Sequence, residues 1–290
     1  MLEHRNTPAR DPERVVLLGA GGFIGKALNR RLVEARIPTL PLTSSDLDLC
    51  AEDAPARLKE TLRSGDSLVV LSALTPDRGR GIDTFMKNLK MIENLCAALG
   101  DSPCAHVVYF SSDAVYPLGT GLIDEESAAA PTDLYGVMHR SRELMLLQSL
   151  RQLCILRPSL IYGADDTHNS YGPNRFRRQA HAEGKIVIGG EGEETRDHVY
   201  IDDVASLTHL VLTHQSTGIL NLATGNATDF GSVARHVAAL FDGEVEVCPT
   251  PRKFPITHRS FDTTALLKAF PDFTFTSLEE GLQLAHEGMN

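Results

Sequence analysis

The chain has 290 residues, a formal net charge of -10, and 42% hydrophobic against 23% charged residues. This balance is typical of a folded globular protein, and the length suits one large α/β domain or a domain with a smaller appendage. The negative charge argues against nucleic acid and membrane surfaces as partners, because both favour a basic footprint.

Cysteine usage and the start of the chain point to a cytoplasmic protein. The five cysteines form no Cys-x-x-Cys pair, so we expect reduced, mostly buried thiols. Residues 1–13 are polar, which predicts a loose terminus rather than a signal peptide or an anchor. No apolar run approaches the about 20 residues of a membrane span, and the histidines lack metal-ligand spacing. We therefore expect no membrane span and no metal.

A glycine-rich loop follows the first expected strand. Residues 14–18 are aliphatic and predict a strand, and a helical pattern of apolar residues follows the loop. Between them Gly19, Gly22 and Gly25 form G-x-x-G-x-x-G. Such glycines allow a tight turn and let backbone N–H groups approach a pyrophosphate at a helix N-terminus. The glycines alone would fit a plain tight turn, but their place between strand and helix predicts a dinucleotide site.

The end of the second expected strand, residues 39–42, bears on the choice between NAD and NADP. Residues 43–45 read Thr-Ser-Ser, with no acid before Asp46. An acid at this strand end usually holds a ribose 2′-hydroxyl, whereas small hydroxyls can donate to a 2′-phosphate. Ser44 and Ser45 therefore favour NADP slightly, with helix capping as the alternative.

Strands and helices alternate up to residue 158. We expect helices over 54–63 and 82–99 and strands over 67–72, 105–110 and 153–156. This alternation predicts a parallel sheet with right-handed crossovers. Beyond the glycines, the expected cofactor contacts are Phe23, Ile24, Ser44, Ser45, Asp48, Leu49, Ala73, Tyr135, His139 and Pro158.

Two stretches carry side chains suited to proton transfer. Ser112 follows the strand 105–110, so its hydroxyl lies at the carboxyl edge, where open α/β sheets bind ligands. Tyr135 and His139 are four residues apart in a helix that begins near Asp133, so they share one helix face. A hydroxyl, a phenol and an imidazole can thus converge over one substrate.

The regular alternation ends after residue 158. Residues 163–173 predict a long polar loop, and a helix that opens at Asn174 concentrates arginines, either for binding or as a solvated face. Further expected elements are a strand running into a helix over 195–205, a strand over 218–222, and helices over 230–241, 263–270 and 278–287. We expect a dinucleotide-binding domain over 14–158, with a return segment near 196–224, and a smaller lobe, mainly substrate-binding, over 159–290.

The motifs together resemble the extended short-chain dehydrogenase/reductases, the group of sugar-nucleotide epimerases, dehydratases and reductases. The resemblance runs from about Arg14 to Glu287 and includes the glycine loop, the 110–116 stretch, Leu156-Arg157-Pro158 with Tyr162-Gly163, and the 196–205 stretch. It implies an α/β fold of the Rossmann type, a doubly wound parallel sheet with a smaller C-terminal lobe. It also implies NADP or NAD, a nucleotide-sugar substrate and a homodimer.

The resemblance assigns roles and exposes departures. Ser112 and Tyr135 take the catalytic positions, and Arg196 takes that of an arginine that meets the substrate diphosphate. The family motif is Tyr-x-x-x-Lys, whose lysine holds the nicotinamide ribose and lowers the pKa of the tyrosine, but here the position is His139. An unperturbed His titrates near about 6.5 and Lys near about 10.4. We expect His139 to take part in catalysis and the rate to fall as it loses its proton, near about pH 6 to 7 if its pKa is not strongly perturbed.

Two other departures concern the substrate. Ala114 stands where dehydratases of the group have a second acid, which disfavours water elimination, and Leu160 replaces a common substrate-binding Asn. A reductase of a 4-keto sugar is favoured, with an NAD-dependent epimerase as the alternative. A cofactor-binding regulatory protein with reduced catalysis is the alternative from another class. The expected substrate contacts are Ser112, Asp113, Asn174, Arg196 and Arg259.

Overall fold

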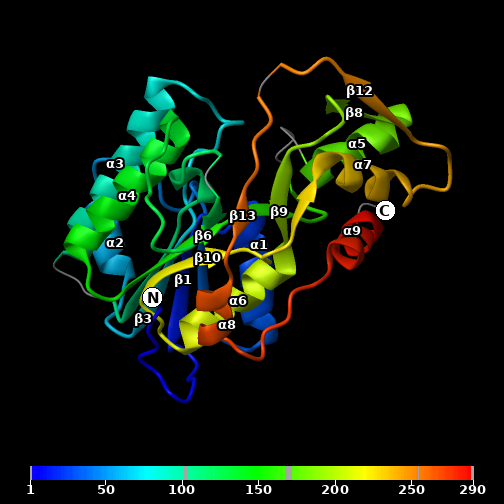
Figure 1. Ribbon diagram of the computed structural model, residues 1–290. Coiled ribbons are helices and arrows are strands. Elements are labelled where there is room, and N and C mark those ends of the chain that lie inside the picture. The colour runs from blue at the N-terminus through cyan, green and yellow to red at the C-terminus, as the bar shows by residue number, and fades with distance from the viewer. Residues whose placement is uncertain (1, 101–103, 120, 167–171, 254, 289–290) are drawn as a thin grey trace.

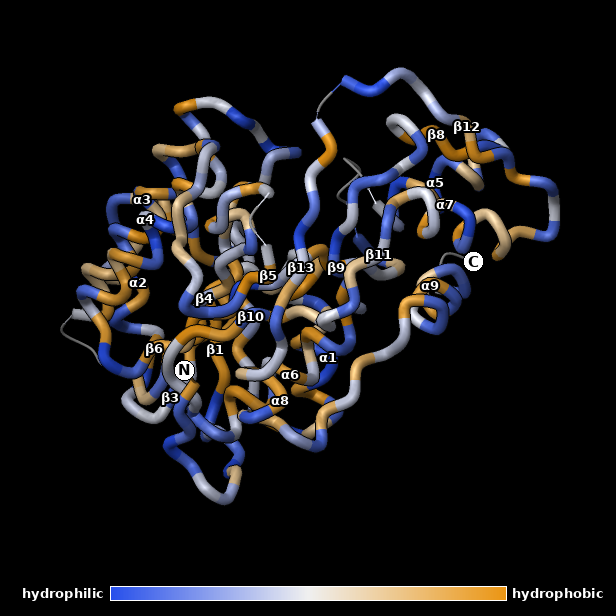
Figure 2. Tube along the Cα trace, viewed as in Figure 1, coloured by the Kyte–Doolittle hydropathy of each residue, from blue (hydrophilic) through white to orange (hydrophobic). Residues whose placement is uncertain are grey.

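The computed structural model of the chain describes residues 2–100, 104–119, 121–166, 172–253 and 255–288. Its centre is a six-stranded sheet in the order β10-β6-β4-β3-β1-β2, in which every neighbouring pair is parallel. β3 and β4 are buried along their whole length, which explains the apolar runs Leu68–Val70 and Val107–Phe110 that end them (Figure 2). The six strands are β1 (Arg14–Leu18), β2 (Thr39–Leu42), β3 (Asp66–Val70), β4 (His106–Phe110), β6 (Leu153–Pro158) and β10 (Gly218–Leu222).

Helices cover both faces of this sheet (Figure 1). Leu28 and Leu32 of one helix pack with Val204 and Leu207 of another to form the core on one face. On the other face, Ile92 belongs to a separate core. This doubly wound arrangement confirms the predicted fold class. The helices are α1 (Phe23–Glu34) and α6 (Ile201–Thr213) on the first face, and α2 (Ala54–Thr61), α3 (Ile82–Leu99) and α4 (Leu134–Ser149) on the second.

The winding direction reverses at β1. The chain passes from β1 outward to β2, then crosses back to β3 on the other side of β1 and continues to β4, β6 and β10. Such a switch point leaves a crevice at the carboxyl ends of the two strands, because their following loops diverge. The loops after β1 and β3 therefore mark the expected ligand site.

A second group of elements lies on the far side of α1 and α6 (Figure 1). Its core includes Phe176, Ile186, Val233 and Leu282. The elements of this smaller lobe are α5 (Gly172–Glu183), β8 (Lys185–Gly189), α7 (Phe230–Ala238), β12 (Glu246–Thr250) and α9 (Leu278–Glu287). Small sheets complete the chain, with β7 (Leu160–Tyr162), β9 (Thr195–Tyr200) and β11 (Ala227–Asp229) in one, and β5 (Leu122–Ile123) and β13 (Ser260–Phe261) in another; α8 (Thr264–Ala269) follows.

The strands and helices predicted up to residue 158 are all present in the structure within a few residues, whereas the starting segment differs from its prediction. Glu3 exchanges backbone hydrogen bonds with Thr217 at 2.9 and 2.8 Å. His4 contacts the Ser216 hydroxyl at 2.8 Å and the Ala269 carbonyl oxygen at 2.9 Å. The expectation of a loose terminus over residues 1–13 is therefore wrong, because polar side chains anchor the segment to β10 and α8.

The structure also contains elements that the sequence did not predict, most of them in the second half of the chain. Strands β5, β7, β8, β11, β12 and β13 were not predicted, and α5 begins at Gly172 rather than Asn174. Part of the predicted polar loop, residues 167–171, lies outside the described residues. Along the described chain, no helix combines the length and apolar character needed to cross a membrane.

Candidate active site

The loops after β1 and β3 touch at the switch point. Gly19 has a φ of +92°, and a Cβ built there would lie 2.9 Å from the backbone nitrogen of Ser72. A Cβ on Gly25 would lie 2.5 Å from the Gly19 carbonyl oxygen. Only glycine therefore lets the two loops meet and lets α1 pack directly on the loop backbone.

Gly22 instead has room for a side chain. Its φ is -78°, and the nearest atom to a Cβ there would be the Gly19 carbonyl oxygen at 3.4 Å. Gly22 is the N-cap of α1, no side chain caps this helix, and its first turn holds no acidic residue. The first-turn N–H groups of Phe23 and Ile24 and the positive end of the helix dipole are thus suited to an anion.

The side chains of Phe23 and Ile24 are engaged elsewhere. Ile24 packs against the core under α1, and Phe23 lines a cavity beside Tyr200 and Ile201. The contribution of these two positions to the loop is therefore their backbone.

The end of β2 presents hydroxyls together with a carboxylate. The Asp46 carboxylate accepts hydrogen bonds from the Thr43 backbone N–H at 2.8 Å and its hydroxyl at 2.6 Å. These bonds lower the pKa of Asp46, so it stays charged. Ser44 and Ser45 are exposed beside it. Because both kinds of group stand here, the preference for NADP stays a prediction.

The other predicted cofactor positions differ in exposure. Asp48 is exposed, but the Leu49 side chain is 5% exposed within the core, which keeps it from an adenine ring. Ala73 lies in a loop that Asn88 holds through the backbone N–H and carbonyl of the next residue, at 2.8 and 3.0 Å. Pro158 is buried at the end of β6.

Ser112 stands directly after β4. Its hydroxyl oxygen accepts a hydrogen bond from the Ala114 N–H at 3.1 Å and donates to the Asp113 carboxylate at 3.3 Å. The first bond caps a short 3₁₀ turn over Asp113–Val115. The second is long, so the hydroxyl can redirect its hydrogen to a ligand at the carboxyl edge.

Helix α4 packs on this turn and carries Tyr135 with it. A Cβ on Gly136 would overlap the Ala114 carbonyl oxygen, so glycine is required for the close approach. Tyr135 is half-buried in the first turn of α4, and its ring meets His139 edge to face with centroids 4.7 Å apart. Ser112, Tyr135 and His139 therefore lie on adjoining elements, as the spacing predicted.

His139 is buried and neutral. It is 2% exposed, and its Nδ1 lies 2.9 Å from the Tyr109 hydroxyl. Burial, with a contribution from the Arg142 charge, lowers the pKa of His139 to about 3. The fall of the rate near about pH 6 to 7 depends on an unperturbed pKa of His139, and because burial lowers this pKa we do not expect the fall in that range.

Arg142, which the sequence analysis did not single out, is the cation on the inner face of α4. It is 0% exposed, donates to the Ser72 carbonyl oxygen at 2.7 Å and lies 5.2 Å from the centre of the Tyr109 ring. Among the described residues, no carboxylate lies within ion-pair distance of Arg142. The sequence signal for Arg142 was its position seven residues after Tyr135 and three after His139, because residues at these spacings lie on the same face of a helix.

Glu143, the next residue on α4, forms a buried ion pair with Arg157. It accepts two hydrogen bonds from Arg157 at 2.8 and 2.7 Å and one from the Ser111 hydroxyl at 2.6 Å. Arg157 also donates to the Tyr116 hydroxyl at 2.8 Å. These contacts tie α4, β6 and the end of β4 together and so hold the segment that carries Ser112.

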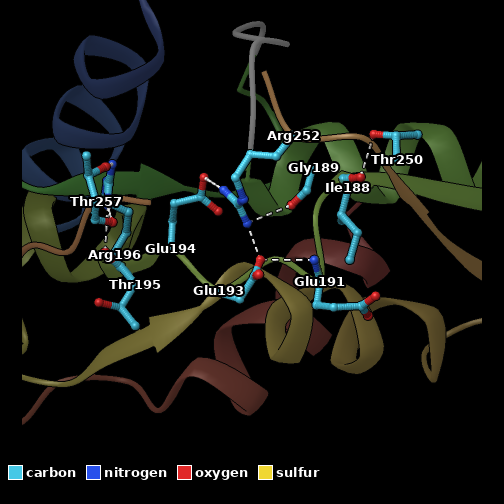
Figure 3. A network of polar contacts seen from close by, with 10 residues as sticks. All are labelled: Ile188, Gly189, Glu191, Glu193, Glu194, Thr195, Arg196, Thr250, Arg252 and Thr257. Atoms are coloured by element: carbon cyan, nitrogen blue, oxygen red, sulfur yellow. Dashed lines mark hydrogen bonds and ion pairs between the residues drawn. The ribbon is translucent and has the colours of Figure 1, made fainter. Parts of the chain in front are cut away.

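Arg196, on β9, is held by the segment before β13 (Figure 3). Its guanidinium donates to the Thr257 carbonyl oxygen at 2.7 Å and to the Thr257 hydroxyl at 2.8 Å. Arg252, in the same view, pairs with Glu193 and Glu194 and so joins this segment to the loop after β8. The predicted diphosphate role of Arg196 stays a prediction.

Arg259 and Asp113, both predicted substrate contacts, bind each other. Their ion pair measures 2.7 Å, and Arg259 also donates to the Tyr116 carbonyl oxygen at 3.0 Å. Arg259 is 6% exposed. In this state the pair links the segment before β13 to the turn after Ser112.

Asn174, the remaining predicted substrate contact, is engaged by the fold. It is 2% exposed, accepts a hydrogen bond from Arg177 at 3.0 Å and donates to Asp166. Arg177 is 1% exposed, and burial lowers its pKa to about 10. Arg177 is therefore not part of a solvated face, and its role is to support the loop that leads into α5.

Solved structures with the same fold bind nicotinamide dinucleotides. A GDP-L-fucose synthetase from Naegleria fowleri bound to NADP has a TM-score of 0.85 at 17% identity, covering 96% of this chain and 94% of that one. An NAD dependent NDP-hexosamine 5,6-dehydratase of tunicamycin biosynthesis has a TM-score of 0.84 at 20% identity, covering 95% and 97%. UDP-glucose 4-epimerase from Thermus thermophilus, in complex with NAD, has a TM-score of 0.81 at 19% identity, covering 95% and 98%.

A family model described as the NAD dependent epimerase/dehydratase family matches residues 15–223. The chain belongs to this family. Membership confirms the resemblance to the extended short-chain dehydrogenase/reductases and identifies an NAD(P)-dependent enzyme. The matched residues include the glycine loop, Ser112, Tyr135 and Arg196.

The residues at the switch point fit the dinucleotide on which the family depends. The space beside Gly22, which a Cβ would fill, adjoins an uncapped helix N-terminus. On α4, the His139 Nε2 atom is buried with no hydrogen-bond partner among the described residues. The glycine loop would hold the pyrophosphate, and His139 and Tyr135 would face the nicotinamide end. Among the described side chains, no cluster of three or more His, Cys, Asp or Glu could hold a metal ion.

Proposed function

We propose that the protein is an NAD(P)-dependent oxidoreductase that reduces the 4-keto group of a nucleotide-activated sugar. The observation that carries the proposal is the packing of Gly136 on the turn after Ser112, which brings Tyr135 and Ser112 to one edge of the sheet beside the glycine loop. Solved structures with this fold support the substrate class, since one of them was determined with UDP-glucuronic acid and NAD.

Each residue of the proposed site has one task. Tyr135 gives its proton to the carbonyl oxygen as the carbonyl becomes an alcohol. Ser112 donates a hydrogen bond to the same oxygen and so orients it. His139 positions the ribose next to Tyr135. The nicotinamide, when bound, supplies the hydride.

The substrate would lie toward the smaller lobe. Arg196 offers a planar guanidinium suited to two phosphate oxygens. Asp113 and Arg259 stand beside the Ser112 turn, and Asn174 stands at the start of α5. Asp113 is paired with Arg259, and Ala114 offers no second acid, so an acid pair for water elimination is lacking at this turn. This pairing favours reduction or epimerisation over dehydration.

The decisive experiment mixes the protein with NADPH or NADH and a panel of UDP-, GDP- and dTDP-linked 4-keto sugars. A reductase lowers the absorbance of the reduced nicotinamide in step with formation of the 4-hydroxy sugar. An epimerase instead converts the 4-hydroxy sugar to its epimer without net cofactor consumption. Cofactor binding without either reaction for any member of the panel would support the regulatory alternative and contradict an active enzyme.

We further propose that the enzyme is a homodimer formed through the outer faces of α3 and α4. These neighbouring helices expose apolar side chains that a solvated surface does not need. Replacing Leu144 by Glu should yield monomers with an unchanged fold, as measured by light scattering and circular dichroism. A monomeric wild-type protein would contradict this assembly. The exposed residues are Ile82, Met86, Leu134, Val137, Leu144 and Leu147.

A further inference from the structure

The hydroxyl of Tyr109 and the ring of His139 form an isolated buried pair. Tyr109 comes from β4 and is 1% exposed, and His139 comes from α4 and is 2% exposed. The Tyr109 hydroxyl oxygen lies 2.9 Å from His139 Nδ1. Among the described residues this is the one hydrogen bond of either group.

Both members of the pair are neutral. Burial raises the pKa of Tyr109 well above its usual value and lowers that of His139 to about 3. Two hydrogens are therefore shared among three positions: the phenol oxygen and the two ring nitrogens. If the ring hydrogen were on Nδ1, the phenol hydrogen would have no acceptor. The favourable arrangement has Tyr109 donating to Nδ1, with the ring hydrogen on Nε2 of His139.

Nε2 then carries a buried N–H without a partner. This atom has no hydrogen-bond partner among the described residues. Its ring meets Tyr135 edge to face at 4.7 Å, so the N–H lies on the helix face that carries the proposed proton donor. An unpaired buried N–H is unfavourable, which makes this place receptive to a hydrogen-bond acceptor from a ligand.

We propose that Tyr109 is a positioning residue: it holds His139 as the tautomer with hydrogen on Nε2, which donates to a ribose hydroxyl of the nicotinamide cofactor as a neutral group. The inference rests on the proposed placement of the nicotinamide beside Tyr135. It explains how a histidine serves at a position where a charged lysine is usual. A ribose hydroxyl can either donate or accept a hydrogen bond, and by keeping the ring hydrogen on Nε2 Tyr109 makes His139 the donor and the ribose oxygen the acceptor.

Arg142 reinforces this assignment. It is the fixed cation near the pair, held by the Ser72 carbonyl oxygen and the face of the Tyr109 ring. A second positive charge on His139 would be repelled by Arg142. The neighbouring Glu143 does not offset this, because its carboxylate is bound by Arg157 and Arg140. The pair therefore stays neutral whether or not a ligand is bound.

The first test is made on the full-length protein without ligand. Nitrogen NMR of ring-labelled histidines distinguishes the two neutral tautomers and the imidazolium, and His139→Gln assigns the signal. We expect one neutral tautomer, with hydrogen on Nε2, between about pH 5.5 and 8. Hydrogen on Nδ1, or an imidazolium within this range, would overturn the inference. This result does not depend on whether the proposed reaction occurs.

The second test replaces the phenol by a ring of the same shape. Tyr109→Phe should weaken NADPH binding about fivefold to tenfold by calorimetry, because a freed His139 loses its preferred tautomer. Tyr162→Phe is the matched control, since Tyr162 is likewise buried, at 0% exposed, but its hydroxyl donates to the Leu278 carbonyl oxygen at the start of α9. Equal affinities for the two variants would overturn the inference. If the wild-type protein bound no nicotinamide dinucleotide, the proposed function would be wrong. The NMR experiment would still show which neutral tautomer His139 adopts.

Discussion

The two sides of the candidate active site differ in how their polar groups are occupied. On the cofactor side, the N-terminus of α1 has no side-chain cap and the His139 Nε2 atom has no partner among the described residues. On the substrate side, Arg259 is paired with Asp113 and Asn174 is held by its neighbours. In the proposed site the cofactor side is thus preorganised for its ligand, whereas a nucleotide sugar would have to replace hydrogen bonds that the chain makes with itself. Cofactor affinity should therefore depend mainly on the contacts that the glycine loop makes with the cofactor. Substrate affinity should depend on how much stronger the contacts with substrate are than the hydrogen bonds within the chain that they replace.

The largest expected effect is on kcat, and it comes from a variant that should leave cofactor binding intact. Tyr135→Phe removes the proposed proton donor but keeps the ring beside His139. We expect kcat to fall about a thousandfold, within the range of about 10² to 10⁴ typical of general acids. Cofactor affinity by calorimetry should stay within about twofold, because the lost group serves the substrate oxygen. A variant with near wild-type kcat would remove Tyr135 from the mechanism.

Acid should weaken both halves of the molecule through their buried histidines. Burial lowers the pKa of His139 to about 3 and the pKa values of His106 and His198 to about 4. In the unfolded chain each titrates near about 6.5, so the unfolded state binds more protons below that pH. Stability is therefore full above about pH 6.5 and is lost as the pH falls toward about 4. At pH 5 each histidine should remove about 2 kcal/mol from the free energy of unfolding.

Urea unfolding at pH 7 and pH 5 measures this loss. His198→Phe removes one titrating group from β9 while keeping a ring next to Phe230, whose centroid lies 5.8 Å from that of His198. The variant should lose about 2 kcal/mol less between the two pH values than the wild type. Equal losses in the two proteins would mean that His198 is not held neutral by burial.

The next effect is a loss of cofactor affinity that should leave the substrate side unchanged. Gly22→Val should fold, since the nearest atom to a Cβ there is 3.4 Å away, but its side chain would fill the space proposed for the pyrophosphate. We expect NADPH affinity to fall about tenfold or more. Gly81→Val is the matched control, because Gly81 is likewise a helix N-cap without a side-chain cap and with open space around its Cβ position. Unchanged affinity in a folded Gly22→Val protein would place the cofactor elsewhere.

The smallest effect is on KM for the nucleotide sugar and tests the substrate side. Arg196→Ala should raise KM for the nucleotide sugar about fivefold and leave cofactor affinity unchanged. The effect is modest because substrate must first displace Thr257 from the guanidinium. Arg252→Ala is the control, since Arg252 is already paired with Glu193 and Glu194. A loss of cofactor affinity with unchanged KM would reverse the assignment of Arg196.

The central sheet could be predicted because its signals are local. The runs at 14–18, 39–42 and 218–222 became β1, β2 and β10 with the same bounds. Short, mostly apolar runs between turn signals are the local pattern of strands in a parallel sheet, and this pattern identified even the partly exposed β2. The glycine loop and the spacing of Tyr135 and His139 are local signals too. In the smaller lobe β12 is as long as β1, but none of its residues is buried, so it lacks such a pattern.

The state of the side chains could not be predicted from the same sequence. Arg259 and Asp113 are 146 residues apart, and no local pattern joins them. The pKa of His139 depends on burial beneath β4, which only the packed structure supplies. The pairing of Tyr109 with His139 was likewise hidden, because Tyr109 reads as one more apolar position in a buried strand.

The most direct test of the proposed function is isotope transfer to the substrate. NADPH with deuterium at the transferable position is incubated with a nucleotide 4-keto sugar, and the product is analysed by mass spectrometry. We expect a 4-hydroxy sugar nucleotide that carries one deuterium, formed by the wild type and at a rate about a thousandfold lower by Tyr135→Phe. Tight binding of NADPH with no deuterium in any sugar of the panel would contradict it.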